Sequence, residues 1–135
     1  MAGEGYVFEG LAVPAEIGRV HDLLEEARAE HPEIPPTDLM LFETALVEIA
    51  NNVVEHGRPA GRVEWRLTVR VRPGAIEAEL DDTSVATAPT ERAVMPGEEA
   101  EGGRGLAIAE AILDGMELDR SEHGNHWRLM RRFSS

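Results

Sequence analysis

A strictly alternating stretch near the middle of the chain constrains the fold more than any other feature. From residue 62 to residue 72, every second residue is apolar and the residues between them are Arg, Glu or Thr. The apolar positions are Val63, Trp65, Leu67, Val69 and Val71. Because successive side chains of a β-strand point to opposite faces, this pattern predicts a strand with one buried and one charged face. A sheet with such a strand needs a second layer against its apolar side.

The alternation continues beyond a predicted turn at Pro73-Gly74, which gives an antiparallel hairpin. Ile76, Ala78 and Leu80 share the apolar face of the second strand, and Asp82 has the same parity. Asp82 is therefore predicted to point towards the covered face at the end of its strand. A carboxylate at such a place needs a hydrogen-bonding partner.

Two helices are predicted before this hairpin. The first opens at Pro14, and the Pro-rich segment 31–36 breaks it. Thr37 is the expected N-cap of the second helix, which runs to Gly57 as its terminator. Apolar residues recur every three or four positions along the second helix and predict one buried stripe. They are Leu39, Phe42, Leu46, Ile49 and Val53.

The other periodic segments complete a single domain over residues 1–135. They predict a strand over Tyr6–Val13, a helix over Leu106–Leu113 and a closing hairpin over Met116–Arg120 and Trp127–Phe133, with its turn near Gly124-Asn125. Residues 84–103 show neither period, and an unstructured loop of that length in a small domain is usually functional. The order predicts an α+β two-layer sandwich whose mixed, mostly antiparallel sheet carries helices on one face.

The composition excludes several classes of function. A net charge of −13 argues against binding to nucleic acid or to anionic membrane surfaces. The chain has no Cys, which fits the cytoplasm, and no apolar run long enough to cross a membrane. It also has no Lys, because every basic residue is Arg, so a Walker-type phosphate lysine and a Schiff-base lysine are excluded. Any nucleotide chemistry here must use backbone amides, Arg and a metal ion.

Glu48 and Asn52 carry the first chemical signal. They lie four residues apart, and therefore one above the other on a helix face beside the apolar stripe. A carboxylate can accept a proton or orient a nucleophile, and an amide oxygen can ligate a hard cation such as Mg²⁺. The adjacent Asn51 and Asn52 are poor helix formers, which points to a reason other than helix stability. The plain alternative is an ordinary polar helix face.

Three features in this order resemble the ATP-binding domain of the GHKL superfamily, which includes DNA gyrase, MutL and histidine kinases. They are Glu48 with Asn52 on a helix, Asp82 at a strand end, and the glycine-rich stretch 102–105 before a helix. Within that superfamily nearly the whole chain is similar to the anti-sigma-factor serine kinases (the RsbW/SpoIIAB branch). The supporting motifs are Glu48-x-x-x-Asn52-x-x-x-His56-Gly57, Asp82 with Pro89 seven residues later, and Gly124-Asn125-x-Trp127-x-Leu129-x-Arg131.

The resemblance implies a role for each matching residue. Glu48 would be the general base, Asn52 the Mg²⁺ ligand, and Asp82 the acceptor for the adenine amino group. Gly103, Arg104, Gly105 and Leu106 match the second glycine motif, whose amides meet phosphates at a helix N-terminus. Residues 84–103 would form the lid over ATP.

The resemblance also implies partners. They are a STAS-type anti-sigma-factor antagonist that is phosphorylated on serine, a sigma factor that is sequestered, and a second copy of the chain in a homodimer. The output would be regulation of transcription in the cytoplasm.

Three departures from the family motifs keep a second hypothesis open. Some family members carry Thr near the adenine on the last hairpin, where this chain has Asn125 and His126. Ser84 stands where the first glycine motif of the family has Gly, beside the nucleotide, and the lid carries Glu98, Glu99 and Glu101 near the expected phosphates. These features favour a non-catalytic binding module with weak or no nucleotide binding. A histidine-kinase catalytic fragment is the third hypothesis. It is disfavoured because the sequence has no room for a phospho-acceptor helix pair.

Overall fold

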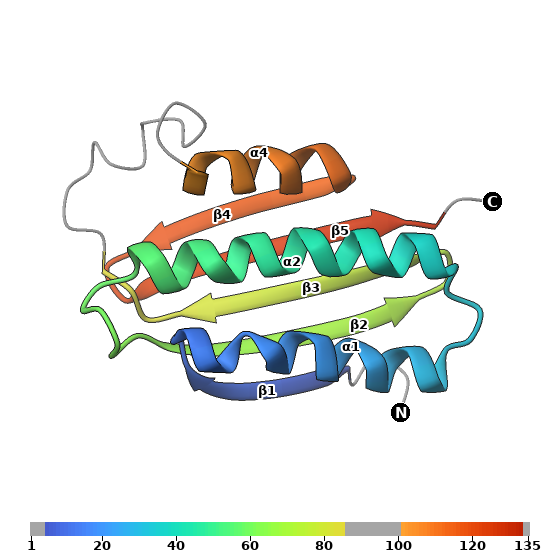
Figure 1. Cartoon of the computed structure of the whole chain (residues 1–135), viewed down its shortest axis with the longest axis horizontal. Coiled ribbons are helices and arrows are strands. Elements are labelled where there is room, and N and C mark those ends of the chain that lie inside the picture. Colours follow the sequence, from blue (N-terminus) through green and yellow to red (C-terminus); the bar gives the residue numbers. More distant parts are fainter. Residues whose placement is uncertain (1–4, 86–100, 134–135) are drawn as a thin grey trace.

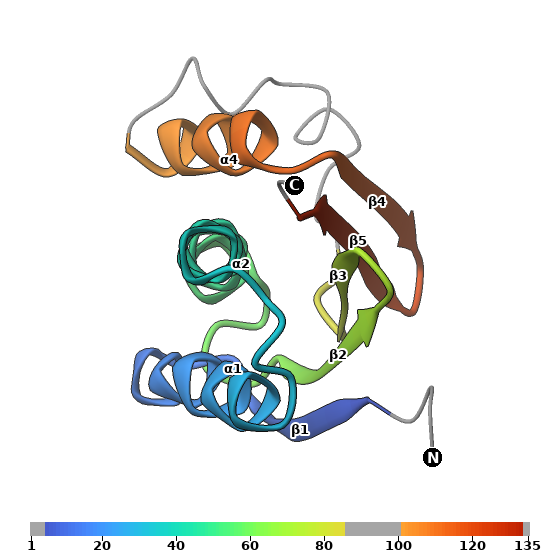
Figure 2. The same cartoon turned by 90° about the vertical axis from the view of Figure 1, so that its right-hand side faces the viewer.

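The computed structural model describes residues 5–85 and 101–133, with the backbone alone for residues 101–104. The elements in chain order are β1 (Tyr6–Leu11), the 3₁₀ turn η1 (Pro14–Glu16), α1 (Gly18–Glu30), α2 (Pro36–His56), β2 (Glu64–Arg72), β3 (Ala75–Asp82), α4 (Glu101–Ile112), β4 (Gly115–Ser121) and β5 (Gly124–Arg132). The strands form one sheet, and α1, α2 and α4 cover one of its faces (Figure 1). Seen from the side, the two layers are separate (Figure 2). The predicted two-layer α+β fold is confirmed.

The strand order in the sheet is β1-β2-β3-β5-β4, and each pairing among the described strands is antiparallel. The hairpin partner of β4 is β5, yet β5 also pairs with β3 in the centre of the sheet. This places Trp65, Asp82 and Asn125 in one row across three adjacent strands. The row lies where β3 ends, and it positions the candidate site.

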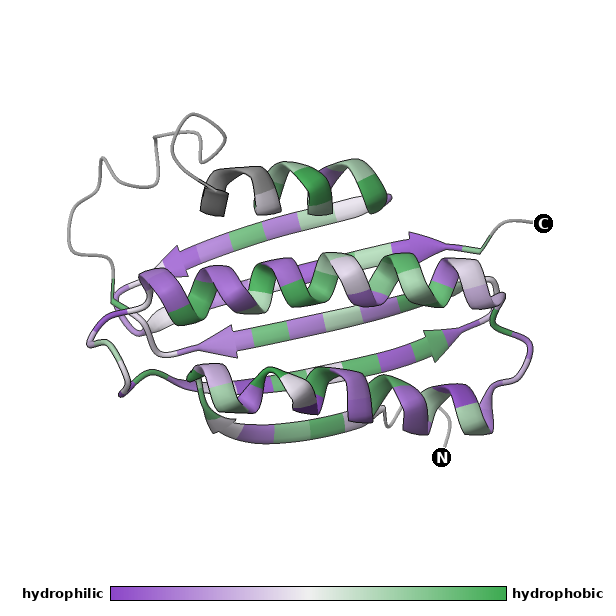
Figure 3. Ribbon diagram, viewed as in Figure 1, coloured by the Kyte–Doolittle hydropathy of each residue, from purple (hydrophilic) through white to green (hydrophobic). Residues whose placement is uncertain are grey.

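The apolar face of the sheet and the apolar stripe of α2 meet in the core. Hydrophobic and hydrophilic residues alternate along β2 and β3 (Figure 3), and Trp65, Leu67 and Val69 are buried. All five predicted stripe residues of α2 are buried as well: Leu39, Phe42, Leu46, Ile49 and Val53. Burying apolar surface is the main stabilising term in folding, so these two patterns account for the arrangement of the layers.

The start of α2 differs from the prediction. The helix begins at Pro36 after an extended Pro35, and no side-chain cap hydrogen bond is formed, so Thr37 lies inside the first turn and is not the N-cap. Proline suits this position because its fixed φ matches the helix and its missing N–H would have no partner there. Asp38 in the same turn is fully buried and forms an ion pair with Arg131 of β5 at 2.8 Å.

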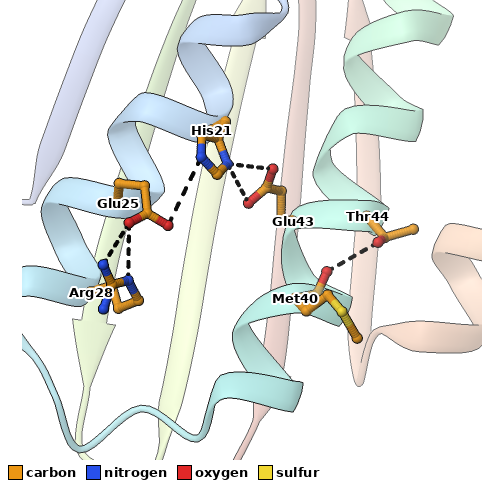
Figure 4. A network of polar contacts seen from close by, with 6 residues as sticks. All are labelled: His21, Glu25, Arg28, Met40, Glu43 and Thr44. Atoms are coloured by element: carbon orange, nitrogen blue, oxygen red, sulfur yellow. Dashed lines mark hydrogen bonds and ion pairs between the residues drawn. The ribbon is translucent and has the colours of Figure 1, made fainter.

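A polar network joins α1 to α2 on their outer side (Figure 4). His21 Nδ1 lies 2.9 Å from a carboxylate oxygen of Glu43, and Glu25 receives a hydrogen bond from Arg28 at 2.7 Å. The hydrogen bond with Glu43 raises the pKa of His21 above its ordinary value. The imidazole of His21 therefore links the two helices through groups that stay in contact with solvent.

The helix after the long loop starts earlier than predicted. Helix α4 begins at Glu101, so Gly102, Gly103 and Gly105 lie within its first turns and not in a loop before it. Glycine weakens a helix by about 1 kcal/mol relative to Ala, which is why the sequence alone placed the start at Leu106. Among the described residues, no helix is both long and apolar enough to cross a membrane.

Candidate functional site

Asp82 is the centre of the candidate site. It is the last residue of β3 and is only 4% exposed, whereas its neighbour Asp81 points outwards. The prediction from strand parity is confirmed. Burial raises the pKa of Asp82, and hydrogen bonds from Ser84, Asn125 and Trp127 oppose that rise. A buried carboxylate with a raised pKa at the end of a strand is typical of a binding or catalytic position.

Three donors hold the Asp82 carboxylate in place. The Ser84 amide and the Asn125 side-chain amide donate to Oδ1 at 2.9 and 3.1 Å, and the Trp127 indole donates to Oδ2 at 3.3 Å. The sequence analysis named Asn125 and Trp127 within the motif of the last strand but gave neither a contact with Asp82. Both follow from the β3–β5 pairing, which sequence periodicity cannot reveal.

Ser84 connects Asp82 to the C-terminal end of α2. Its hydroxyl accepts a hydrogen bond from the Arg58 amide at 3.0 Å, and Val85 donates to the Arg58 carbonyl at 3.2 Å. A Cβ built on Gly57 would lie 3.6 Å from the Ser84 Cβ. The Ser84 side chain is therefore turned towards the end of α2, and it fixes the Asp82 turn against that helix.

Glu48 lies against the first turns of α4. A Cβ built on Gly105 would overlap Glu48 Oε1, so at this position any larger residue would displace the carboxylate. The backbone of α4 can approach α2 closely because Gly105 has no side chain. Glu48 also lines an open groove of about 530 Å³ between α1 and α2, together with Met40, Glu43 and Val47.

The positions of the second glycine motif divide into two groups. In an α-helix only the first four amides lack partners within the helix, and in α4 these belong to residues 101–104. Gly103 and Arg104 are in this group, although the side chain of Arg104 is outside the described residues. Gly105 and Leu106 are not, because their amides take part in the helix. Gly105 instead makes room for Glu48, and Leu106 packs against the core.

Helix α2 connects the two parts of the site. Glu48 and Gly57 are nine residues apart, which is about 14 Å along a helix axis. Asp82 lies at the Gly57 end and Gly105 at the Glu48 end. Asn52 lies between them, half-buried, one turn from Glu48. Glu48 and Asn52 thus share one face of α2, Gly105 lies against Glu48, and Asp82 and Ser84 lie beside the C-terminal end of the helix.

A hollow of about 800 Å³ lies over the same strand ends, and Asp82 and Asn125 of the candidate site are among the residues that line it. Its lining includes Glu9, Glu64, Arg66, Asp81, Asp119 and His126. Most of these residues belong to the outward-facing rows of the strands, away from the helices. Since carboxylates predominate among these charged groups, the hollow is unsuited to a polyanion.

The lid residues Pro89, Glu98 and Glu99 lie outside the described part of the chain, as does the side chain of Glu101.

Comparison with known proteins agrees with this fold. The chain is similar to the histidine kinase domain of the blue-light-activated histidine kinase of Erythrobacter litoralis EL346 (16% identity, TM-score 0.56), covering 72% of this chain and 48% of that one. A longer structure of that kinase gives 16% identity and a TM-score of 0.60, with 75% and 32% covered. The chain thus spans about half and about a third of these two proteins.

The catalytic domain of the histidine kinase ThkA, in a nucleotide-free form, is similar over its full extent. Identity is 11% and the TM-score is 0.57, with 94% of this chain and 95% of that domain covered. No curated protein matches the chain. Residues 11–131 match the histidine kinase-like ATPase domain family. The chain therefore belongs to the histidine kinase-like ATPase domain family, the GHKL group.

Proposed function

We propose that this domain binds Mg·ATP and acts as a protein-serine kinase of the anti-sigma-factor type. It would transfer the γ-phosphoryl group to a serine of a STAS-type antagonist and would sequester a sigma factor. Membership of the GHKL group supports ATP and Mg²⁺ as the ligands. The serine specificity and both partners rest on the similarity of the motifs to the anti-sigma branch.

The position of Glu48 carries the enzymatic part of the proposal. On one side its carboxylate lies against the α4 turn, and on the other it lines the open groove between α1 and α2. A general base for phosphoryl transfer must contact both the phosphate site and an incoming hydroxyl. In this proposal Glu48 does both, and a polypeptide in the groove would bring the serine to it.

The residues present fit the nucleotide. Gly105 lets the start of α4 lie against Glu48, and the amides of residues 101–104, which lack partners within the helix, can donate to phosphate oxygens. At the other end of α2, Asp82 can accept a hydrogen bond from a base amino group. Asn52 would hold Mg²⁺ through its amide oxygen. When bound, Mg²⁺ supplies charge neutralisation to the phosphates, while Glu48 accepts the serine proton.

The direct test mixes the purified protein with Mg·ATP labelled in the γ-phosphate and a STAS-type antagonist. The expected result is a phosphoserine on the antagonist, with none formed when its target serine is changed to Ala. Recovery of unlabelled antagonist after prolonged incubation with a nucleotide-bound protein would refute the kinase assignment.

Homodimer formation belongs to the same proposal, and the sedimentation mass of the protein at tens of micromolar tests it.

Replacing Asn52 with Ala should weaken binding of Mg·ATP much more than binding of ATP in EDTA. The reason is that an amide oxygen contributes to affinity only through the metal ion it ligates. Calorimetric titrations with and without Mg²⁺ make the comparison, and Asn51→Ala on the same helix is the control. If Asn52→Ala bound Mg·ATP as tightly as the unaltered protein, Asn52 would have no metal role. The substitution would then only improve the helix by a few tenths of a kcal/mol.

Ser84 favours one alternative, a non-catalytic binding module. It places a buried side chain, bonded to the Arg58 amide, where the family motif has glycine. A turn held in this way keeps its backbone further from the base of a bound nucleotide. A protein that binds the sigma factor and the antagonist, but neither nucleotide nor phosphate, would support this alternative.

A further inference from the structure

The C-terminal end of α4 is tied to two other elements by the side chain of Arg131. One terminal nitrogen of the guanidinium donates to the carbonyl of Ile112, the last residue of α4, at 2.6 Å. The other terminal nitrogen and Nε lie 2.8 and 2.9 Å from Asp38 Oδ1. Asp38 belongs to the first turn of α2, so one side chain of β5 joins the start of α2 to the end of α4.

A second contact lies further along α4. Gly105 sits against Glu48, and a Cβ at this position would overlap the carboxylate. Because Ile112 is joined to the start of α2 and Gly105 lies beside Glu48, the two helices are antiparallel (Figure 1). Apolar packing between helices is not directional, so the hydrogen bonds of Arg131 are suited to fix where α4 lies along α2. Any shift of α4 along α2 would move the amides of residues 101–104 relative to Glu48.

Stability alone does not account for a buried ion pair at this place. Asp38 is completely buried, and the side chain of Arg131 is only 17% exposed. Removing two charges from water is costly, and an apolar pair of similar volume is often equally stable or more stable. The best attested use of such buried polar groups is to select one register between packed elements.

We propose that Arg131 is a positioning residue that sets the place of α4 along α2, and thereby the place of the phosphate-facing amides relative to Glu48 and Asn52. The inference rests on the proposed nucleotide binding and adds to it a residue at the opposite end of α4. The helix has 12 residues and is therefore about 18 Å long. Arg131 thus acts on the phosphate site through the rigid helix and not by contact.

The test removes both charges and keeps the buried volume, in the full chain. Asp38→Leu/Arg131→Met should resist urea as well as the unaltered protein does, because it leaves no unpaired charge in the core. Its affinity for Mg·ATP should nevertheless fall roughly 10–100-fold, the equivalent of one hydrogen bond to a charged phosphate. Its affinity for adenosine, which has no phosphate, should be unchanged. Arg128→Met, the matched control on the outer face of β5, should alter neither affinity.

Hydrogen exchange of the nucleotide-free protein supplies a readout that needs no ligand. Amides of α4 should exchange faster in the double variant than in the unaltered protein, while amides of β3 should keep their rates. Arg131→Lys is a second, more conservative variant. It keeps a cation beside Asp38, but its single nitrogen cannot take the positions of all three guanidinium nitrogens. It should therefore show the same faster exchange in α4 and the same selective loss of affinity for Mg·ATP.

The two readouts together decide the proposal. Folded variants that protect α4 as before and bind Mg·ATP as tightly as the unaltered protein would overturn it, and Arg131 would then serve stability alone. Equal losses of affinity for Mg·ATP and for adenosine would also overturn it, because they would indicate a general disturbance of the site. If the unaltered protein bound no nucleotide, the proposed function would fail, and hydrogen exchange would still decide whether Arg131 positions α4.

Discussion

Replacing Glu48 with Gln should slow phosphorylation of the antagonist by about 10²–10⁴-fold, the usual cost of removing a general base. Gln keeps the size of the side chain, so the contact with Gly105 should persist. The affinity for Mg·ATP should stay within a few-fold, because the substitution removes the proton acceptor and not a nucleotide ligand. Single-turnover kinetics with saturating Mg·ATP separates the rate of transfer from binding.

A matched control for this experiment lies on the same helix. Glu55 is an exposed carboxylate near the C-terminal end of α2, and Glu55→Gln should transfer phosphate at the original rate. If Glu48→Gln transferred phosphate as fast as the unaltered protein, Glu48 would not be the general base. Equal slowing in both variants would show that the negative charge of the helix matters and that a positioned base does not.

The second large effect concerns the buried ion pair between α2 and β5. Arg131 donates from Nε to Asp38 Oδ1 at 2.9 Å and from a terminal nitrogen to the Ile112 carbonyl at 2.6 Å. Asp38 is completely buried. Replacing Arg131 with Ala removes the guanidinium and leaves that carboxylate in the core, which typically costs 3–5 kcal/mol. The free energy of unfolding should fall by roughly this amount, measured by urea denaturation with an unchanged m-value.

Arg128 on the same strand provides the control. Its ion pair with Glu117 is 3.9 Å long, and both side chains are exposed. Exposed pairs contribute about 0–1 kcal/mol, so Arg128→Ala should change the stability little. If Arg131→Ala lost less than about 1 kcal/mol, the pair would not hold α2, α4 and β5 together as described.

Much of this fold was predictable because periodicity reports burial directly. The alternation predicted the burial of Val63, Trp65, Leu67 and Val69, and the stripe on α2 predicted its buried residues; these predictions are confirmed. At the end of the strand Val71 is only half-buried, and Thr68 on the opposite face is buried. The parity of Asp82 with Ile76 predicted its burial for the same reason. Local patterns of this kind depend only on the geometry of a strand or a helix.

The residues that complete the site were not predictable in the same way. Asn125 and Trp127 reach Asp82 only because β5 lies between β3 and β4, and no local pattern encodes the order of strands. Gly105 was assigned to a phosphate loop, but it lies in α4 beside Glu48, despite the poor helix propensity of glycine. Thr37 was assigned as a cap from its residue type, although Pro36 starts the helix one position earlier.

Binding of Mg·ATP at Asp82 tests the central claim most directly. Calorimetric titration of the folded protein should give a saturable isotherm with Mg·ATP and a much weaker one with Mg·GTP. Asp82→Ala should abolish binding, because it removes the carboxylate that three donors hold in place for the base. Absence of heat with Mg·ATP at about millimolar concentration, the weak limit for specific binding, would contradict the account. An Asp82→Ala variant that bound Mg·ATP as tightly as the unaltered protein would contradict it as well.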